Sequence, residues 1–159
     1  METMTEFSFG KTSIAKSYDS IIVPYLFNDW AKDLINNYGP WKNKSVLDLA
    51  SGTGIVLKHL VAEQPKNVIA VDLNPEMLTL ARNKVSESNV EIDFIESSIE
   101  DLSLPESSID VVACQQGFQF FPDKILSAKI LHSILKPGGR IMASTWCPCL
   151  LYTSDAADD

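Results

Sequence analysis

Two short segments carry the residue types best suited to binding a ligand. Residues 46–54 form an apolar run that ends in a turn with Gly52 and Gly54, and residues 68–72 form a second apolar run that ends in Asp72. Glycine allows the backbone to approach a ligand closely, and a carboxylate can accept hydrogen bonds from both hydroxyls of a ribose. Together the two segments predict a site for a ligand that contains a nucleoside.

The elements that must position these residues follow from the apolar pattern. Short apolar runs bounded by glycine or proline predict buried strands, and the amphipathic stretches between them predict helices. Asn74 and Pro75 suit the N-cap and the first position of a helix. We expect strands over residues 45–50, 68–72, 90–96, 109–114 and 140–145, and helices after Gly54 and over residues 75–86 and 123–135. This alternation predicts an α/β fold with a mostly parallel sheet and helices on both faces.

The N-terminal part has a different pattern from the rest of the chain. Aromatic and aliphatic residues recur at helical spacing over residues 14–38, and Pro24 is expected to break or kink this helix. A Gly-Pro pair at 39–40 ends it. We therefore expect residues 1–44 to form a helical segment that packs on a domain beginning at Ser45. A chain of 159 residues is long enough for one such domain.

Composition limits the kinds of binding partner and the cellular compartment that we expect. The formal net charge is −8, and the sequence shows no basic patch of the kind that nucleic-acid binders carry. No apolar run approaches the roughly 20 residues of a membrane span, and the start of the chain lacks the apolar region of a signal peptide. The 3 cysteines are too few for a disulfide framework, which fits a reducing compartment. We expect a cytoplasmic protein with no nucleic-acid partner and no membrane span.

Four segments, taken in order, resemble the class I S-adenosylmethionine-dependent methyltransferases, in particular the single-domain type that acts on small molecules. The segments are residues 46–54, 71–77, 114–123 and 135–140, and the resemblance extends over about residues 45–145. It implies a Rossmann-like sheet, S-adenosylmethionine as the cofactor and a small-molecule acceptor for the methyl group.

The resemblance also implies which residues contact the cofactor. The turn and the strand that leads into it would lie beneath the methionine portion, through Asp48, Ala50, Ser51, Gly52 and Gly54. Asp72 would hold the ribose diol, while Leu73 and Met77 would pack near the adenine. Ser98, with Ile99 beside it, stands where many members have an acid for the adenine amino group. A serine hydroxyl accepts that hydrogen bond more weakly than a carboxylate does.

The resemblance assigns no catalytic side chain. A methyl sulfonium is an activated donor, so the transfer mainly needs an acceptor held in line with water excluded. A general base is needed only where the acceptor loses a proton in the slow step. Cys114 and Gln115, at the end of the fourth strand, would lie near the sulfonium and the acceptor. Cys147 and Cys149 lack further ligands nearby for zinc, so no metal is expected.

Other interpretations remain open at this point. A nicotinamide-binding Rossmann oxidoreductase also has an acid after its second strand, although its pattern has a third glycine where Leu57 stands here. A non-catalytic cofactor-binding module is also compatible, because methyl transfer requires no obligatory catalytic residue. The aromatic residues Phe118, Phe120 and Phe121 suit either an acceptor pocket or the core. Tyr18 suits either the core or a cover over the cofactor.

The end of the chain departs from the family pattern. The family usually has seven strands, and only five are expected here. Residues 149–159 resemble an in-frame translation of a sequencing adapter, so we expect a non-native tail there and an incomplete methyltransferase domain over residues 45–148. The fifth strand would then be an edge strand with apolar residues Ile141, Met142 and Ala143, which favours association. We expect such a chain to fold marginally and to bind the cofactor weakly.

Overall fold

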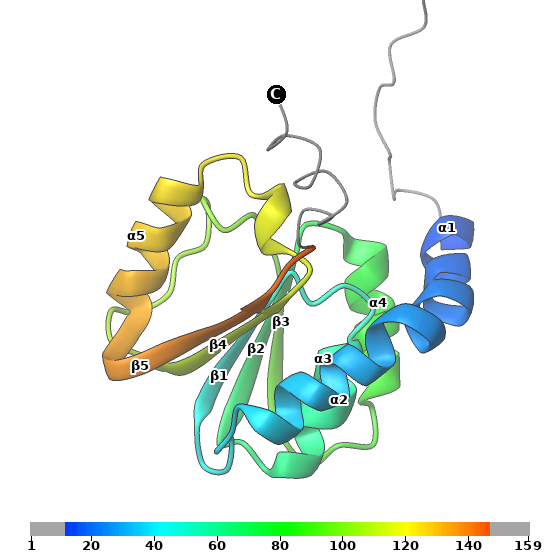
Figure 1. Ribbon diagram of the computed structural model, residues 1–159, viewed down its shortest axis with the longest axis horizontal. Helices are drawn as coiled ribbons and strands as arrows, with labels where there is room; N and C mark the ends of the chain where they lie inside the picture. The colour runs from blue at the N-terminus through cyan, green and yellow to red at the C-terminus, as the bar shows by residue number, and fades with distance from the viewer. Residues whose placement is uncertain (1–11, 147–159) are drawn as a thin grey trace, which may run out of the picture.

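The computed structural model of the protein describes residues 12–146, and the expected tail at 149–159 lies outside this range, as do Cys147 and Cys149. Within residues 12–146, five parallel strands form one sheet in the order β3-β2-β1-β4-β5 (Figure 1). The strands are β1 Ser45–Leu49, β2 Asn67–Asp72, β3 Glu91–Glu96, β4 Ile109–Gln115 and β5 Leu135–Ser144. The chain runs outward from β1 to β3 and then returns to β4 on the other side of β1. Such a reversal of strand order creates a crevice at the carboxyl ends of the two central strands.

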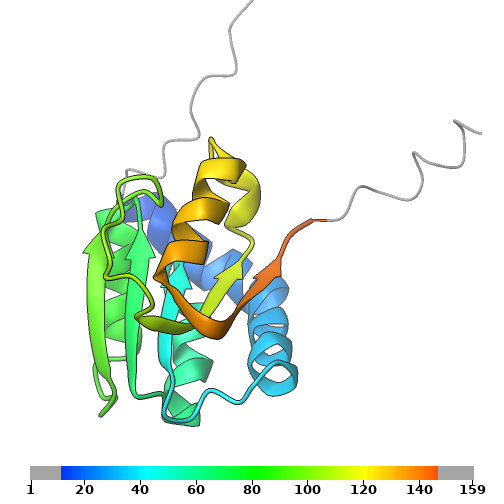
Figure 2. The same ribbon diagram turned by 90° about the vertical axis from the view of Figure 1, so that its left-hand side faces the viewer.

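Helices cover both faces of the sheet, so the expected Rossmann-like α/β fold is confirmed (Figure 1, Figure 2). One face carries the N-terminal helices and those between β1 and β3, namely α1 Thr12–Ser17, η1 Tyr18–Phe27, α2 Asn28–Asn37, α3 Ile55–Leu60, η2 Val61–Glu63 and α4 Pro75–Lys84. The other face carries α5 Lys124–Ile134, preceded by a short 3₁₀ turn, η3 Phe118–Phe120. No helix within residues 12–146 is long and apolar enough to cross a membrane.

Every residue of β1 is buried because the sheet has a hydrophobic core on each face. Val46 and Val111 pack with α2, α3 and α4, while Leu47 and Val112 pack with α5 on the opposite face. Successive side chains of a strand point to opposite faces, so a strand covered on both sides is apolar over most of its length. This burial explains why the central strands could be located from continuous apolar runs.

The expected break of the N-terminal helix at Pro24 is not observed, whereas the alternative expectation of a kink there stays a prediction. The chain stays helical through this residue in a π-helical segment, η1, which joins α1 to α2. The Asn28 N–H donates to the Val23 carbonyl five residues earlier. Proline has no N–H for the usual helical bond, and the wider π-helical turn accommodates it without ending the helix.

The fifth strand begins earlier than expected. It starts at Leu135, which pairs with Ile109, and the pairing register shifts between Ile109 and Val111. Gly138 has a φ of +78°, in the left-handed region that glycine tolerates. The Pro-Gly-Gly run therefore forms an irregular stretch within the strand rather than a loop before it. The boundaries of the other expected elements after Ser45 lie within two residues of those observed.

Candidate active site

The turn after β1 takes a left-handed path at Ala50, Gly52 and Gly54, whose φ values are +56°, +53° and +80°. The Ser51 N–H donates to the Val71 carbonyl at 2.9 Å, so the turn is attached to the neighbouring strand. This path brings the backbone of the turn across the carboxyl ends of β1 and β2.

The two glycines of the turn have different surroundings. A Cβ added at Gly54 would lie 2.9 Å from the Cα and Cβ of Ala81, so this glycine lets α3 begin in close contact with α4. A Cβ added at Gly52 would meet no atom of residues 12–146 within 4 Å. Gly54 therefore serves packing, whereas Gly52 faces open space that a ligand can enter.

Asp72, at the end of β2, is joined directly to the glycine turn. Its Oδ2 accepts from the Gly52 N–H at 2.8 Å and its Oδ1 accepts from the Asn74 N–H at 2.9 Å. Burial raises the pKa of this carboxyl, and backbone hydrogen bonds from Asn74, Gly52 and Leu73 oppose the rise. A carboxylate has about four lone-pair positions, so the three backbone donors leave capacity for a ligand hydroxyl. The structure thus brings together the two segments that the sequence singled out.

Leu73 and Met77, which were expected near the adenine, differ in their exposure to solvent. Leu73 is 70% exposed beside Asp72, whereas Met77 is buried in the first turn of α4. Asn74 caps that helix as predicted, accepting from the N–H groups of Glu76 at 2.9 Å and Met77 at 3.3 Å. Leu73 is therefore the member of this group with surface to offer a ligand.

Ser98 and Ile99, in the segment after β3, do not form an open contact surface. Ile99 is buried in the core on the α5 face. The Ser98 hydroxyl donates to Asp101 Oδ2 at 2.8 Å and accepts from the Asp101 N–H at 3.0 Å. Asp101 is an exposed acid that the sequence analysis did not single out. Its position three residues after Ser98 could have indicated an acid close to the expected adenine contact. Contact of Ser98 and Ile99 with adenine stays a prediction.

Cys114 and Gln115 lie at the carboxyl end of β4. Burial, followed by the nearby charge of Asp48, raises the pKa of the Cys114 thiol to about 12, so it stays protonated near neutrality. Gln115 donates through Nε2 to the Phe27 carbonyl at 3.0 Å and thereby links β4 to η1. A Cβ added at Gly117 would lie 2.4 Å from the Cβ of Ala50, so the loops after β1 and β4 nearly touch. Sequence reasoning missed Gly117.

A pocket, the turn pocket, lies between η1, the glycine turn and the end of β4. Its lining consists of Tyr18, Val23, Phe27, Ala50, Ser51, Gly52, Thr53, Ile55, Val56, Gln115 and Gln116. Tyr18 therefore borders the pocket, with its ring 5.9 Å from that of Phe27. Its pKa is raised to about 12 by burial and by the charges of Asp72 and Asp19. The N-terminal helical part thus forms one wall of the candidate site.

Three buried side-chain oxygens near the turn pocket have no hydrogen-bond partner in the part of the chain that the structure describes. They are Asp48 Oδ2, Ser51 Oγ and Gln115 Oε1. Burial, and secondarily the charge of Asp72, raises the pKa of Asp48 to about 8. Buried polar atoms normally have partners, so the unpaired oxygens of Ser51 and Gln115, which line the pocket, indicate a ligand with N–H or O–H donors. A cationic ammonium group satisfies this requirement with three donors.

An ion pair holds η1 against α4. Lys84 donates to Asp19 and also to Thr53 Oγ1, the latter at 3.4 Å, so it connects η1, α4 and the glycine turn. Sequence reasoning missed this contact between residues 65 positions apart.

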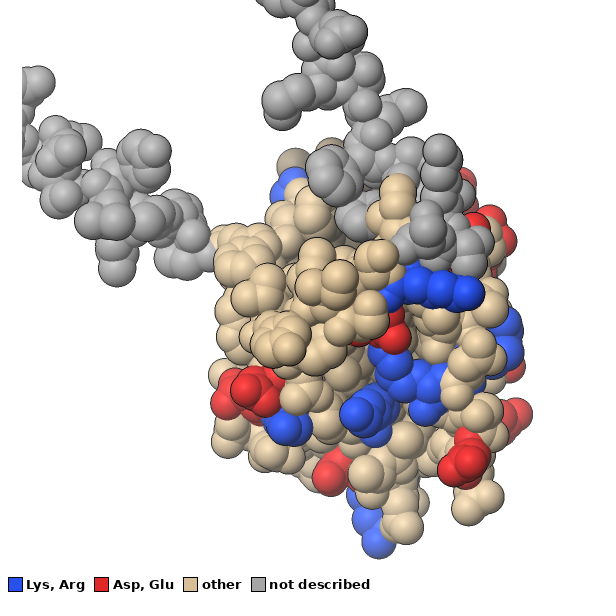
Figure 3. Space-filling model, turned by 90° about the vertical axis from the view of Figure 1, so that its right-hand side faces the viewer, with Lys and Arg blue, Asp and Glu red and all other residues tan. Residues whose placement is uncertain are grey.

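Figure 3 shows Lys and Arg side chains gathered near the middle of one face, with Asp and Glu around them, a grouping not visible in sequence order.

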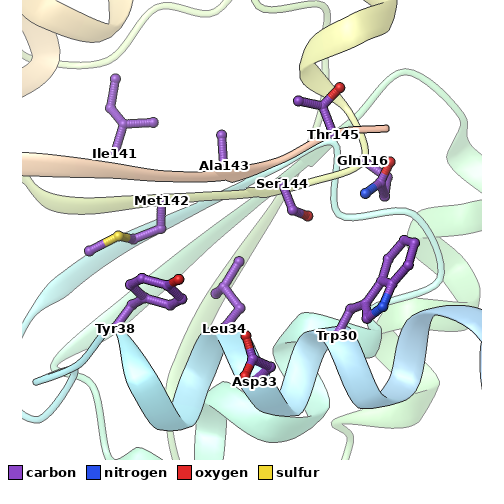
Figure 4. Close-up of a pocket in the computed structure, with 10 residues that line it drawn as sticks. All are labelled: Trp30, Asp33, Leu34, Tyr38, Gln116, Ile141, Met142, Ala143, Ser144 and Thr145. Atoms are coloured by element: carbon purple, nitrogen blue, oxygen red, sulfur yellow. The ribbon is translucent and has the colours of Figure 1, made fainter. Parts of the chain in front are cut away.

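A second pocket, the α2–β5 pocket, lies between α2 and β5 (Figure 4). Its lining consists of Trp30, Asp33, Leu34, Tyr38, Gln116, Ile141, Met142, Ala143, Ser144 and Thr145. Met142 and Ser144 point toward α2, whereas Ile141 and Ala143 point away from it. Gln116 lines both this pocket and the turn pocket, so the two adjoin.

The phenylalanines after β4 belong mainly to the core. Phe118 and Phe121 pack edge to face with centroids 5.3 Å apart and contact the α5-side core. Phe120 is 77% exposed. None of the three lines either of the two pockets within the described residues.

Comparison with known proteins places this geometry in a family. Residues 46–139 match the family model described as a methyltransferase domain. The chain is 32% identical over 147 residues to a ubiquinone/menaquinone biosynthesis C-methyltransferase of Hahella chejuensis, covering 83% of this chain and 59% of the relative. It is 34% identical over 114 residues to a ubiquinone biosynthesis O-methyltransferase of Xylella fastidiosa, covering 71% of this chain and 46% of the relative.

A solved structure with the same fold is a SAM-dependent methyltransferase from Aquifex aeolicus, with a TM-score of 0.72 and 21% identity, covering 86% of this chain and 73% of that chain. The chain thus spans a little over half the length of the curated relative from Hahella chejuensis. The matched residues contain the glycine turn, Asp72 and the end of β4, and the chain belongs to the methyltransferase domain family.

Proposed function

We propose that the protein transfers a methyl group from S-adenosylmethionine to a small-molecule acceptor. The observation that carries the proposal is the hydrogen bond from the Gly52 N–H to Asp72 Oδ2 at 2.8 Å. It joins a turn open to a ligand with a carboxylate suited to a ribose, in a chain of this family. The S-adenosylmethionine would supply a methyl group already activated by a positively charged sulfur.

The residues present fit this cofactor at three points. Asp72 keeps a lone pair for a ribose hydroxyl after accepting the backbone bonds from Gly52, Asn74 and Leu73. The unpaired oxygens of Ser51 and Gln115, with the carboxyl of Asp48 nearby, suit the ammonium of the methionine portion. Gly52 leaves space over the turn. The work left to the chain is to hold the acceptor in line and to exclude water, which Tyr18 and the N-terminal helices would assist.

The remaining assignments belong to the same proposal. Residues 45–148 would form the methyltransferase part, and residues 1–44 would cover its site, in a cytoplasmic protein without a nucleic-acid partner. The two curated relatives, named for quinone biosynthesis, support a small-molecule acceptor, but one is a C-methyltransferase and the other an O-methyltransferase. Leu57 is fully buried in the core where a nicotinamide site has its third glycine, which disfavours the oxidoreductase.

Calorimetric titration with S-adenosylhomocysteine tests the proposed function. We expect Asp72→Ala to weaken binding roughly tenfold to a hundredfold, because hydrogen bonds to a charged group contribute about 1.5–3 kcal/mol. Asp93→Ala, which removes an exposed carboxylate from edge strand β3, is the matched control and should bind as the wild type does. Equal affinity of the two variants would contradict the site assignment. A clear change in NADH fluorescence on mixing would instead support the oxidoreductase.

A further inference from the structure

The α2–β5 pocket differs in character from the turn pocket that it adjoins. Its α2 side presents Trp30, Leu34 and Tyr38, and Met142 points toward them from β5 (Figure 4). Trp30 and Tyr38 are 39% and 49% exposed, which is unusual for large side chains that line a concave surface. Aromatic side chains bury large areas when a flat apolar ligand packs on them. The floor of this pocket therefore suits a planar apolar group.

Polar atoms gather at the end of this pocket nearest the turn pocket. Ser144 points into the pocket, and its Oγ is buried without a hydrogen-bond partner among the described residues. Gln116 adjoins it, donating its backbone N–H to the Ser144 carbonyl at 2.8 Å. Gln116 also lines the turn pocket. A hydroxyl of Ser144 at this junction can donate to or accept from a ligand group.

The charges around the α2–β5 pocket exclude one class of ligand. Among the described residues, no Lys or Arg lines it, and the charged residue that does, Asp33, is an acid. Asp33 is exposed and accepts from Asn37 Nδ2 at 2.6 Å. A ligand carboxylate or phosphate would lose hydration here without gaining a counter-ion and would face a negative charge.

We propose that the α2–β5 pocket binds the methyl acceptor, and that this acceptor is an uncharged aromatic compound whose hydroxyl or amino group bonds to Ser144 at the junction with the turn pocket. The inference rests on the proposed function, since the turn pocket is taken as the site of the methyl donor. Ser144 is a specificity-determining residue in this scheme, and the aromatic side chains of α2 hold the ring.

Three probes of one ring system separate the parts of the proposal. 2-Naphthol carries a ring and a hydroxyl, naphthalene carries the ring alone, and 2-naphthoate carries the ring and a negative charge. We expect ligand-observed NMR titrations to give 2-naphthol an affinity about fivefold above that of naphthalene, as one neutral hydrogen bond provides. 2-Naphthoate should bind most weakly. Tightest binding of 2-naphthoate would overturn the proposed ligand class.

Ser144→Ala and Ser133→Ala form the matched pair of variants. Each removes one oxygen, but Ser133 lies on α5 on the opposite face of the sheet and donates to the Ile130 carbonyl. Ser144→Ala should reduce the affinity for 2-naphthol to that for naphthalene, and Ser133→Ala should leave it unchanged. Equal affinities in both variants would overturn the role of Ser144.

Titration of the same samples with S-adenosylhomocysteine keeps the two proposals distinguishable. Unchanged S-adenosylhomocysteine binding in Ser144→Ala shows that the variant is folded and that its defect is confined to the acceptor site. Failure of all samples to bind S-adenosylhomocysteine would contradict the proposed function, whereas failure of 2-naphthol alone would contradict the acceptor pocket.

Discussion

We expect different defects when Gly52 and Gly54 are each replaced by alanine, mainly weaker cofactor binding for Gly52 and mainly lower stability for Gly54. Both have a positive φ, +53° and +80°, and a left-handed conformation costs an L-residue about 1–2 kcal/mol. That cost applies equally to the two variants. The two variants differ in what the alanine Cβ would contact. At Gly52 it would project into open space, and at Gly54 it would meet Ala81 of α4.

The stability of Gly54→Ala should fall further than that of Gly52→Ala. The Cβ at position 54 would lie 2.9 Å from the Cα and Cβ of Ala81, atoms that move only if α4 moves. Overpacking of this kind adds about 1–3 kcal/mol. We therefore expect the free energy of unfolding to drop by about 2–5 kcal/mol in Gly54→Ala and by about 1–2 kcal/mol in Gly52→Ala.

Cofactor affinity should show the opposite sensitivity. The Cβ at position 52 projects into the space where the cofactor is proposed to lie, so Gly52→Ala should weaken S-adenosylhomocysteine binding at least about tenfold, equivalent to 1.4 kcal/mol. Urea unfolding followed by circular dichroism measures stability, and calorimetric titration measures binding under conditions where each variant is folded.

Gly138→Ala is the control for backbone strain. Gly138 also has a positive φ, +78°, with nothing within 4 Å of an added Cβ, but it lies near the start of β5, away from the turn. If Gly52→Ala binds S-adenosylhomocysteine as tightly as Gly138→Ala does, the space over Gly52 is not the cofactor site. If Gly54→Ala is as stable as Gly138→Ala, the packing argument is wrong.

Two further predictions concern buried charges. Burial, with the charge of Asp72, raises the pKa of Asp48 to about 8, above its value of about 4 in an unfolded chain, so the stability of the wild type relative to Asp48→Asn is greatest at low pH. It should fall by up to about 1.4 kcal/mol per pH unit as pH rises from about 4 to about 8, and a difference constant with pH in urea unfolding would contradict this. Lys84→Met should lower stability by about 1 kcal/mol, because the Lys84 and Asp19 side chains are only 18% and 26% exposed. Lys58→Met, on the exposed side of α3, should have little effect, and equal unfolding midpoints for the two lysine variants would show that the ion pair is not stabilising.

The parallel sheet could be predicted because its central strands are buried on both faces. This burial leaves continuous apolar runs such as residues 68–71 and 111–114. The cap at Asn74 could be predicted because its chemistry is local. The start of β5 could not, because Pro137 and Gly138 are typical of loops, and only the pairing of Leu135 with Ile109 shows that the strand begins before them.

The candidate site was predicted where its chemistry is carried by single segments and missed where it depends on distant contacts. The contact between Gly52 and Asp72 could be predicted because each residue follows or ends one of two neighbouring strands, β1 and β2. The ion pair between Lys84 and Asp19 has no sequence signature because neither residue belongs to a motif. The approach of Gly117 to Ala50 likewise appears only when β4 is placed beside β1.

The unpaired polar atoms at the carboxyl ends of β1, β4 and β5 connect stability with function. Ser51 Oγ, Gln115 Oε1 and Ser144 Oγ are buried without partners in the described structure, and each such atom costs about 1–3 kcal/mol of folding free energy. Elsewhere local features agree with the fold, as at the caps of α4 and α5. Buried polar atoms without partners, gathered at one edge of the sheet, are expected where a ligand supplies the missing hydrogen bonds. Because a ligand that binds only the folded state stabilises it in proportion to RT ln(1 + [L]/Kd), S-adenosylhomocysteine at 100 times its Kd should add about 2.7 kcal/mol. That gain should be smaller in Gln115→Leu, which no longer offers its oxygen to the ligand, when both are compared at the same ligand concentration.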